Sequence, residues 1–365
     1  MNAKTSRLGT SARITWAIAA KDIVDALKNK NTLANIISVF LMMMLYSALP
    51  VLEGSSEPPR LWVYDAGSSS LVEALAERDG VDVRVYPAQE MMEAGLSSGS
   101  VPQLGLAIPA DFDQRVAAGE PIVLAGYVQH WVGDEQAEEV RAFGEQQLAE
   151  LAGGLVSVDI EGNRVYPGPD GGGRSFMVTM SMMFSIVLLG TTIIPHLMIE
   201  EKQTKTLDAL LVSPASAGQI VAGKALAGLF YCLTAAAVMA IFYAPVVLQW
   251  GVFSLAVVAG SLFSVILGLM LGMLLEVRQQ LTLWGFLLLN VLFVPMFLTF
   301  LEGLVPENVI AVLSWVPSAA LAKMFNVSLA GAAPLSEFGL PLAIVVVSTV
   351  GLAAVATWLV RRSDR

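Results

Sequence analysis

Side chains that could act on a substrate or a metal ion are few in this sequence and poorly spaced for either task. The only histidines are His130 and His196, and the only cysteine, Cys232, lies in an apolar run. His196 and Glu200 stand four positions apart, so on a helix they could share a metal ion. A histidine at the end of an apolar span is more commonly a polar residue at the membrane surface. We therefore predict no metal site and no catalytic site.

Nucleotide and soft-metal chemistry also lack their usual residues. Residues 222–225 read Ala-Gly-Lys-Ala, without the upstream glycine spacing or the hydroxyl residue that a phosphate-binding loop requires. The methionines at 42–44 and 177–183 have no partnering cysteines or histidines, so we interpret them as apolar filling. We expect a non-catalytic chain that holds no cofactor and binds no nucleic acid.

The composition is that of a membrane protein. Of 365 residues, 55% are hydrophobic and only 14% are charged, whereas soluble domains have about 45–50% and about 25%. The formal net charge of −10 arises in one segment, residues 53–174, which holds 21 acidic and 7 basic residues. These carboxylates could capture cations, but their spacing fits no ligand set, so we interpret them as a soluble surface.

Six apolar stretches are long enough to cross the hydrocarbon layer, which takes about 20 residues. They lie at about 33–52, 176–198, 220–248, 252–275, 281–301 and 340–360. The moderately apolar stretch 304–333 contains Pro306 and Pro317, which predicts a re-entrant or interfacial hairpin instead of another crossing. About 30 residues precede the first apolar stretch, which favours an uncleaved anchor over a signal peptide.

Basic residues near the span ends predict the orientation, because lysines and arginines in short flanks stay in the cytoplasm. Thirteen of them flank the spans on the side of the N-terminus, whereas Lys323 is the only one in the short loops of the other side. We therefore expect a protein of the cell (inner) membrane with both termini cytoplasmic and residues 53–174 extracytoplasmic.

An amphipathic helix is predicted before the first span. Its apolar stripe consists of Trp16, Ala20, Ile23, Val24 and Leu27, and its polar face of Lys21, Asp22, Asp25 and Lys28. Such a stripe next to a span is typical of a helix that lies along the inner leaflet.

Residues 53–174 alternate between strand-like and helix-like patterns, which predicts a small α/β domain. Strands are expected at 61–64, 81–86, 104–108 and 122–128, and helices at 71–78, 88–96, 111–119 and 134–151. The glycines at 171–173 predict a flexible joint into the second span.

The predicted fold is an α-helical polytopic membrane protein with six transmembrane helices and an inserted small α/β extracytoplasmic domain. Its parts are a cytoplasmic N-terminus with the interfacial helix at 1–31, transmembrane helix 1 at 32–52, the α/β domain at 53–174, and transmembrane helices 2–6 at 175–365. In the fourth span, small residues recur every four positions and predict close helix packing, either within the bundle or across a dimer. They are Gly260, Ser264, Gly268 and Gly272.

The connection after the second span carries a short, charged helix with leucines on one side. Leu207, Leu210 and Leu211 follow the helical period, and Pro214 ends the helix. Ser216 and Gln219 are spaced as a capping box that opens the third span. These exposed leucines must be shielded from water. They could pack against the inner surface of this protein or bind in a groove of a partner protein.

This connection, at about 200–214, resembles the coupling-helix motif of ABC type-2 transporter permeases, commonly E-[KR]-E-x-G-T-L-x-x-L-L-x-[ST]-P. The matching residues are Glu201, Lys202, Thr206, Leu207, Leu210, Leu211, Ser213 and Pro214. Gln203 and Lys205 replace the second acid and the glycine of the motif. The order of interfacial helix, span, external domain and five further spans is also similar to this family, as is the segment 104–121.

The resemblance implies the membrane-spanning permease subunit of an ATP-binding cassette exporter. Such a subunit forms the translocation path as a dimer, with a second copy or a sister permease. A separate cytoplasmic ATPase holds ATP and Mg, and the coupling helix contacts that ATPase. The alternative is a membrane-anchored receptor or scaffold that displays an external binding domain, although six spans are more than an anchor needs. The scarcity of ionisable groups in mid-membrane disfavours a secondary transporter.

Overall fold

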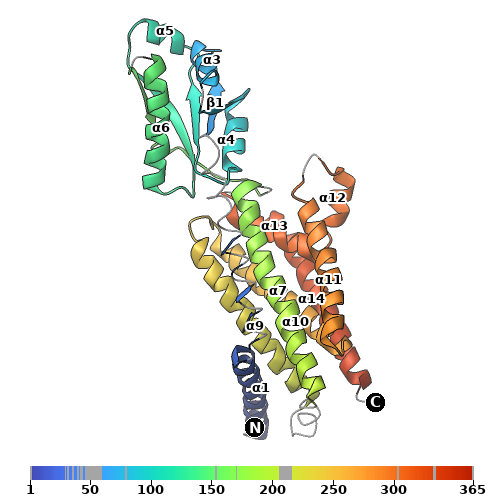
Figure 1. Ribbon diagram of the computed structural model, residues 1–365. Coiled ribbons are helices and arrows are strands. Elements are labelled where there is room, and N and C mark those ends of the chain that lie inside the picture. The colour runs from blue at the N-terminus through green and yellow to red at the C-terminus, as the bar shows by residue number, and fades with distance from the viewer. Residues whose placement is uncertain are drawn as a thin grey trace.

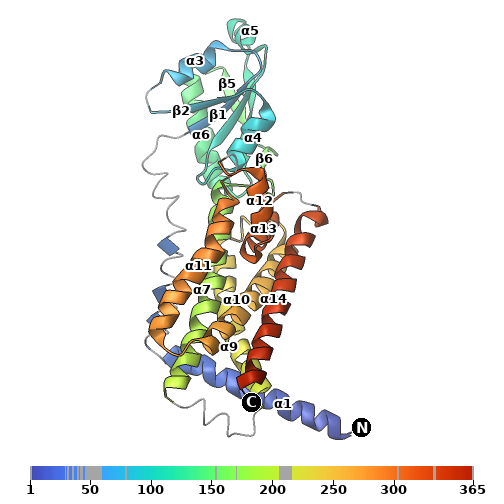
Figure 2. The same ribbon diagram turned by 90° about the vertical axis from the view of Figure 1, so that its right-hand side faces the viewer.

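A computed structural model gives the structure of the chain (Figure 1). It describes residues 2–28, 30, 33–34, 37–38, 41, 44–45, 60–78, 80–152, 154–169, 171–204, 216–301, 304–331 and 334–363. An α/β domain stands at one end of a bundle of long helices, and α1 and the C-terminus lie at the other end (Figures 1 and 2). The predicted first span falls mostly outside the described residues.

The α/β domain is built on a mixed sheet. Its strands are β1 (Arg60–Asp65), β2 (Asp82–Tyr86), β3 (Leu104–Ile108), β4 (Ile122–Gln129), β5 (Val156–Asp159) and β6 (Arg164–Val165). The order is β2-β1-β3-β4-β5, with β6 paired to β4, and only the pairing of β3 with β4 is antiparallel. Four strands lie where the alternating pattern predicts them, whereas β5 and β6 were not predicted.

Helices cover both faces of the sheet because residues along a strand alternate between its faces. On one face, Leu61 and Val63 of β1 belong to a core shared with α3 (Ser70–Ala76), α5 (Phe112–Ala117) and α6 (Asp134–Ala152). On the other face, Trp62 packs with α4 (Gln89–Ser97). The close approach of α6 depends on Gly144, where a Cβ atom would lie 2.3 Å from Leu104.

The bundle consists mainly of helices long and apolar enough to span a membrane. Among the described residues there are five: α7 (Gly173–Gln203), α9 (Ala217–Phe242), α10 (Trp250–Leu274), α11 (Arg278–Leu298) and α14 (Leu335–Ser363). A bend of 98° separates α12 (Glu307–Leu313) from α13 (Pro317–Leu329), within the predicted hairpin. By length and composition this pair could also form one broken span, which would bring the number of crossings to six.

The small residues of α10 face other helices of the same chain. A Cβ atom on Gly268 would lie 2.1 Å from the carbonyl oxygen of Gly190 on α7, and one on Gly260 would lie 2.6 Å from Leu321 on α13. Gly272 faces Met198 of α7, and Ser264 lies against Gly190. In the structure these four residues therefore allow α10 to approach α7 and α13 within the bundle.

The α/β domain is joined to the bundle by polar and aromatic contacts. The guanidinium of Arg174, at the start of α7, lies 4.0 Å from the centre of the Trp131 ring. His130 Nε2 lies 3.4 Å from the carbonyl oxygen of Val246, in the loop between α9 and α10. Gly173, predicted as part of a flexible joint, instead belongs to α7 with φ +54°, and it packs against the carbonyl of Ser98.

Candidate coupling site

A cluster of charged side chains joins three helices at the end of the bundle remote from the α/β domain. Lys224 Nζ of α9 lies 2.5 Å from Glu201 Oε2 of α7 and 3.2 Å from Asp22 Oδ2 of α1 (Asn2–Lys28). Lys21 Nζ of α1 lies 3.0 Å from Glu201 Oε1. The side chains of Asp22 and Lys224 are each 3% exposed. We call Lys21, Asp22, Glu201 and Lys224 the charge cluster.

The position of Asp22 corrects the sequence prediction. The amphipathic pattern placed it on a solvent-facing side of the helix, but the structure buries it together with Ile18, Ala19 and Ala26. These positions form one helical face, and α9 admits it because residue 223 is glycine; a Cβ there would lie 2.7 Å from Ile18. Trp16 of the predicted stripe stays 63% exposed, which is compatible with a helix lying on a bilayer.

The electrostatics of the charge cluster are balanced. Two ammonium groups face two carboxylates, and Asp25 lies 3.4 Å from Lys21 at the exposed edge. Burial raises the pKa of the Asp22 carboxyl; Lys224 opposes this shift, while the negative charge of Glu201 adds to it. Because each buried charge relies on its neighbours, removing any one leaves another without compensation.

Lys202 has a different role from its neighbour. Its Nζ donates to three carbonyl oxygens at the end of α10, those of Gly272, Met273 and Leu275, at 2.8 to 3.0 Å. A cation is favourable there because the last carbonyls of a helix have no partner within the helix. The structure thus places Glu201 and Lys202, two residues of the predicted coupling motif, in contacts within this chain.

The segment between α7 and α9 contains the rest of the motif. Thr206, Leu207, Leu210, Leu211, Ser213 and Pro214 lie outside the described residues. The capping box that opens α9 is confirmed: Gln219 N donates to Ser216 Oγ, and Ser216 N donates to Gln219 Oε1.

Both flanks of this segment are bonded to α1. On the α7 side, Lys21 donates to Glu201 at 3.0 Å. On the α9 side, Gln219 Nε2 donates to Ser11 Oγ at 2.8 Å. Tyr231, further along α9, donates its hydroxyl to the carbonyl of Ile23 at 2.6 Å. The helix α1 therefore links the end of α7 to the start of α9 across the base of the bundle.

The structure also places the residues considered for metal chemistry. Glu200, four positions after His196, lies 3.4 Å from Arg278 of α11 in an ion pair. Within the described ranges, no group of three or more His, Cys, Asp or Glu side chains is arranged to hold a metal ion. Cys232 is fully buried in α9.

Sequence reasoning missed the charge cluster, although one signal pointed to it. Lys224 stands in an otherwise apolar stretch, and a buried ammonium requires a carboxylate partner. The partners lie 202 and 23 positions away, on two other helices, so the sequence alone does not identify them.

Comparison with known proteins agrees with this architecture. A search among curated proteins found no match. A family model described as "ABC-2 family transporter protein" matches residues 32–358. This match covers most of the chain, including the α/β domain, Glu201 and Lys224 of the charge cluster, and the five apolar helices up to residue 358 of α14. The chain therefore belongs to the ABC-2 transporter family, as a membrane permease component of an ABC transporter.

Proposed function

We propose that this chain is the membrane-spanning permease subunit of an ATP-binding cassette exporter, and that residues 205–215 couple it to a separate cytoplasmic ATPase. One observation carries the coupling proposal: α1 braces both flanks of this segment, through the charge cluster on one side and Gln219–Ser11 on the other. Because α1 links the end of α7 to the start of α9, a force applied between these two helices would move them together.

In this proposal α7 carries the movement through the bundle. It has 31 residues, and at 1.5 Å per residue it is about 46 Å long. One end lies at the α/β domain, and the other leads into residues 205–215. The close contact of Gly190 with Gly268 ties α7 to α10, so the two helices move as one body.

The partner ATPase would bind ATP and Mg and would receive Leu207, Leu210 and Leu211 in a groove, as an amphipathic helix is received. The permease would act as a dimer with a second copy or a sister permease, as membership of the ABC-2 family implies. Both termini would be cytoplasmic in the cell (inner) membrane, with the α/β domain outside.

The test is co-purification of the tagged chain with its co-encoded proteins in mild detergent, followed by ATP hydrolysis in lipid nanodiscs. We expect the ATPase to co-purify with the wild-type chain and to be lost when Leu207 and Leu211 are both replaced by Asp. Leu304→Asp is the matched control, because Leu304 is 80% exposed. It closely precedes α12, which lies at the end of the bundle next to the α/β domain (Figure 2). Normal association of the double variant would refute the coupling role. Absence of any ATPase with the wild-type chain would favour a receptor or scaffold.

A further inference from the structure

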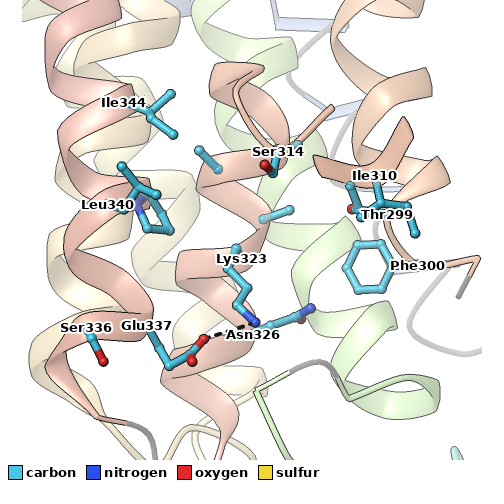
Figure 3. A pocket seen from close by; sticks show the side chains of 14 residues that line it. Thr299, Phe300, Ile310, Ser314, Lys323, Asn326, Ser336, Glu337, Leu340 and Ile344 are labelled. Carbon is cyan, nitrogen blue, oxygen red and sulfur yellow. Dashed lines mark ion pairs between the residues drawn. The ribbon is translucent and has the colours of Figure 1, made fainter. Parts of the chain in front are cut away.

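A cavity of about 350 Å³ lies between α11, α12, α13 and α14, at the end of the bundle that carries the α/β domain (Figure 3). Its volume falls within the range of small-molecule sites. The charge cluster lies at the opposite end, so this cavity is separate from the coupling site.

One end of the cavity is polar. Lys323 Nζ of α13 lies 3.4 Å from Glu337 Oε2, in the first turn of α14. Residues 318–330 are buried except Lys323, whose side chain extends from the helix into the cavity. Figure 3 shows Lys323, Glu337 and Asn326 gathered at this end.

Asn326 adds a fixed amide group. Its Oδ1 accepts a hydrogen bond of 2.7 Å from Thr179 Oγ1 of α7, and both residues are buried. This bond sets the orientation of the amide: because Oδ1 faces α7, the NH₂ group on the other branch of the planar amide points away from Thr179. The cavity therefore offers one ammonium and one amide as donors and one carboxylate as an acceptor.

The remainder of the lining is apolar. Leu340 and Ile344 follow one another along α14, away from the charged end (Figure 3), and Phe300 closes the α11 side. The apolar track continues along α14 to Val347, which is 70% exposed. An occupant of this cavity would have a polar group at one end and a hydrocarbon chain along α14.

We propose that this cavity binds the phosphate–ammonium headgroup of a zwitterionic phospholipid from the leaflet on the side of the α/β domain. The phosphate contacts Lys323 and the amide of Asn326, the primary ammonium contacts Glu337, and an acyl chain lies along α14. A purely anionic headgroup is disfavoured, because Glu337 would face it without a compensating cation. The proposal goes beyond the proposed function and requires neither the ATPase nor a dimer.

The test uses photoreactive phosphatidylethanolamine and phosphatidylglycerol with identical chains, offered to the purified full chain in detergent and counted by intact mass. We expect phosphatidylethanolamine to label the chain roughly tenfold more efficiently, as one charge-assisted contact provides. Peptide mapping should place the label on α13 or α14. Glu337→Gln should abolish the preference, and Lys323→Gln should reduce labelling by both lipids.

Two further variants separate recognition from folding. Glu307→Gln removes an exposed carboxylate of α12 that does not line the cavity, and it should leave labelling unchanged. Lys323→Glu combined with Glu337→Lys keeps an ion pair and should restore the preference for phosphatidylethanolamine lost in Glu337→Gln. Equal labelling of the wild-type chain by both lipids would overturn the proposal, as would a preference that Glu337→Gln leaves intact.

Discussion

Lys224 of α9 forms ion pairs with two carboxylates from two other helices, with its Nζ 2.5 Å from Glu201 Oε2 and 3.2 Å from Asp22 Oδ2. The three side chains come from helices that are far apart in the sequence, and each is at least 90% buried. One ammonium group thus holds α1 against α7 and α9 where the bundle meets residues 205–215.

Replacing Lys224 by Met should be strongly destabilising. The change leaves Asp22 and Glu201 close together with one cation fewer, and breaking a buried ion pair costs about 3–5 kcal/mol. Thermal unfolding in detergent should show the loss. Lys28→Met is the control, because Lys28 is an exposed lysine of α1 outside the charge cluster.

A double variant tests whether charge balance is the cause. Asp22→Asn with Lys224→Met leaves the pair of Lys21 with Glu201, which is balanced. Its unfolding temperature should lie above that of Lys224→Met alone, a coupling that a double-mutant cycle measures. Additive losses would show that the two residues act independently.

The joint between the α/β domain and the bundle should weaken in acid. Burial lowers the pKa of His130 from 6.5, and the nearby charges of Arg174 and Arg164 lower it further, whereas the carbonyls of Val246 and Val165 oppose the shift. The folded protein therefore binds fewer protons at this site than the unfolded chain. Stability from this group is present above about pH 6.5 and falls as the pH drops below it.

Hydrogen exchange at about pH 7.5 and about pH 5.5, corrected for the intrinsic rate, measures this effect. Peptides containing Val246 and Tyr166 should exchange faster at the lower pH, because Tyr166 stacks on the His130 ring at 5.3 Å. In His130→Gln the two pH values should give the same protection there. His196→Gln is the control, because His196 lies near the end of α7 remote from the α/β domain, and it should retain the pH response. If the response persists in His130→Gln, another group causes it.

The spans and most of the sheet follow from local patterns, whereas the charge cluster does not. Apolar runs of about 20 residues locate α7, α9, α10, α11 and α14, and alternation locates β1 to β4. The strand β6 has only two residues, which is too short for a periodic signal. The sequence pattern predicts that Asp22 faces solvent, because helical periodicity does not predict its contact with Lys224, 202 positions away. The contact of Gly268 with Gly190 likewise depends on how the helices pack, which the spacing of small residues in one helix does not specify.

Gly268→Ala should destabilise the contact of α10 with α7. The added Cβ would lie 2.1 Å from the carbonyl oxygen of Gly190, a backbone atom that moves only with the helix. Overpacking of this kind costs about 1–3 kcal/mol and should lower the unfolding temperature. Gly285→Ala in α11 is the matched control, since no atom lies within 4 Å of its Cβ. That change should be neutral or stabilising by up to about 1 kcal/mol. Equal changes in unfolding temperature for Gly268→Ala and Gly285→Ala would show that Gly268 does not lie in a tight helix contact.

Cysteine labelling in intact cells should establish the orientation that the basic flanks predict. Cys232 is 0% exposed, so the native thiol should not react with a membrane-impermeant maleimide. Glu135→Cys places a thiol on an exposed turn of α6, and Gly218→Cys places one on the exposed first turn of α9. With both termini in the cytoplasm, residue 135 is labelled in intact cells and residue 218 only after permeabilisation. The reverse pattern would put the α/β domain in the cytoplasm, and residues 205–215 could then no longer contact a cytoplasmic ATPase.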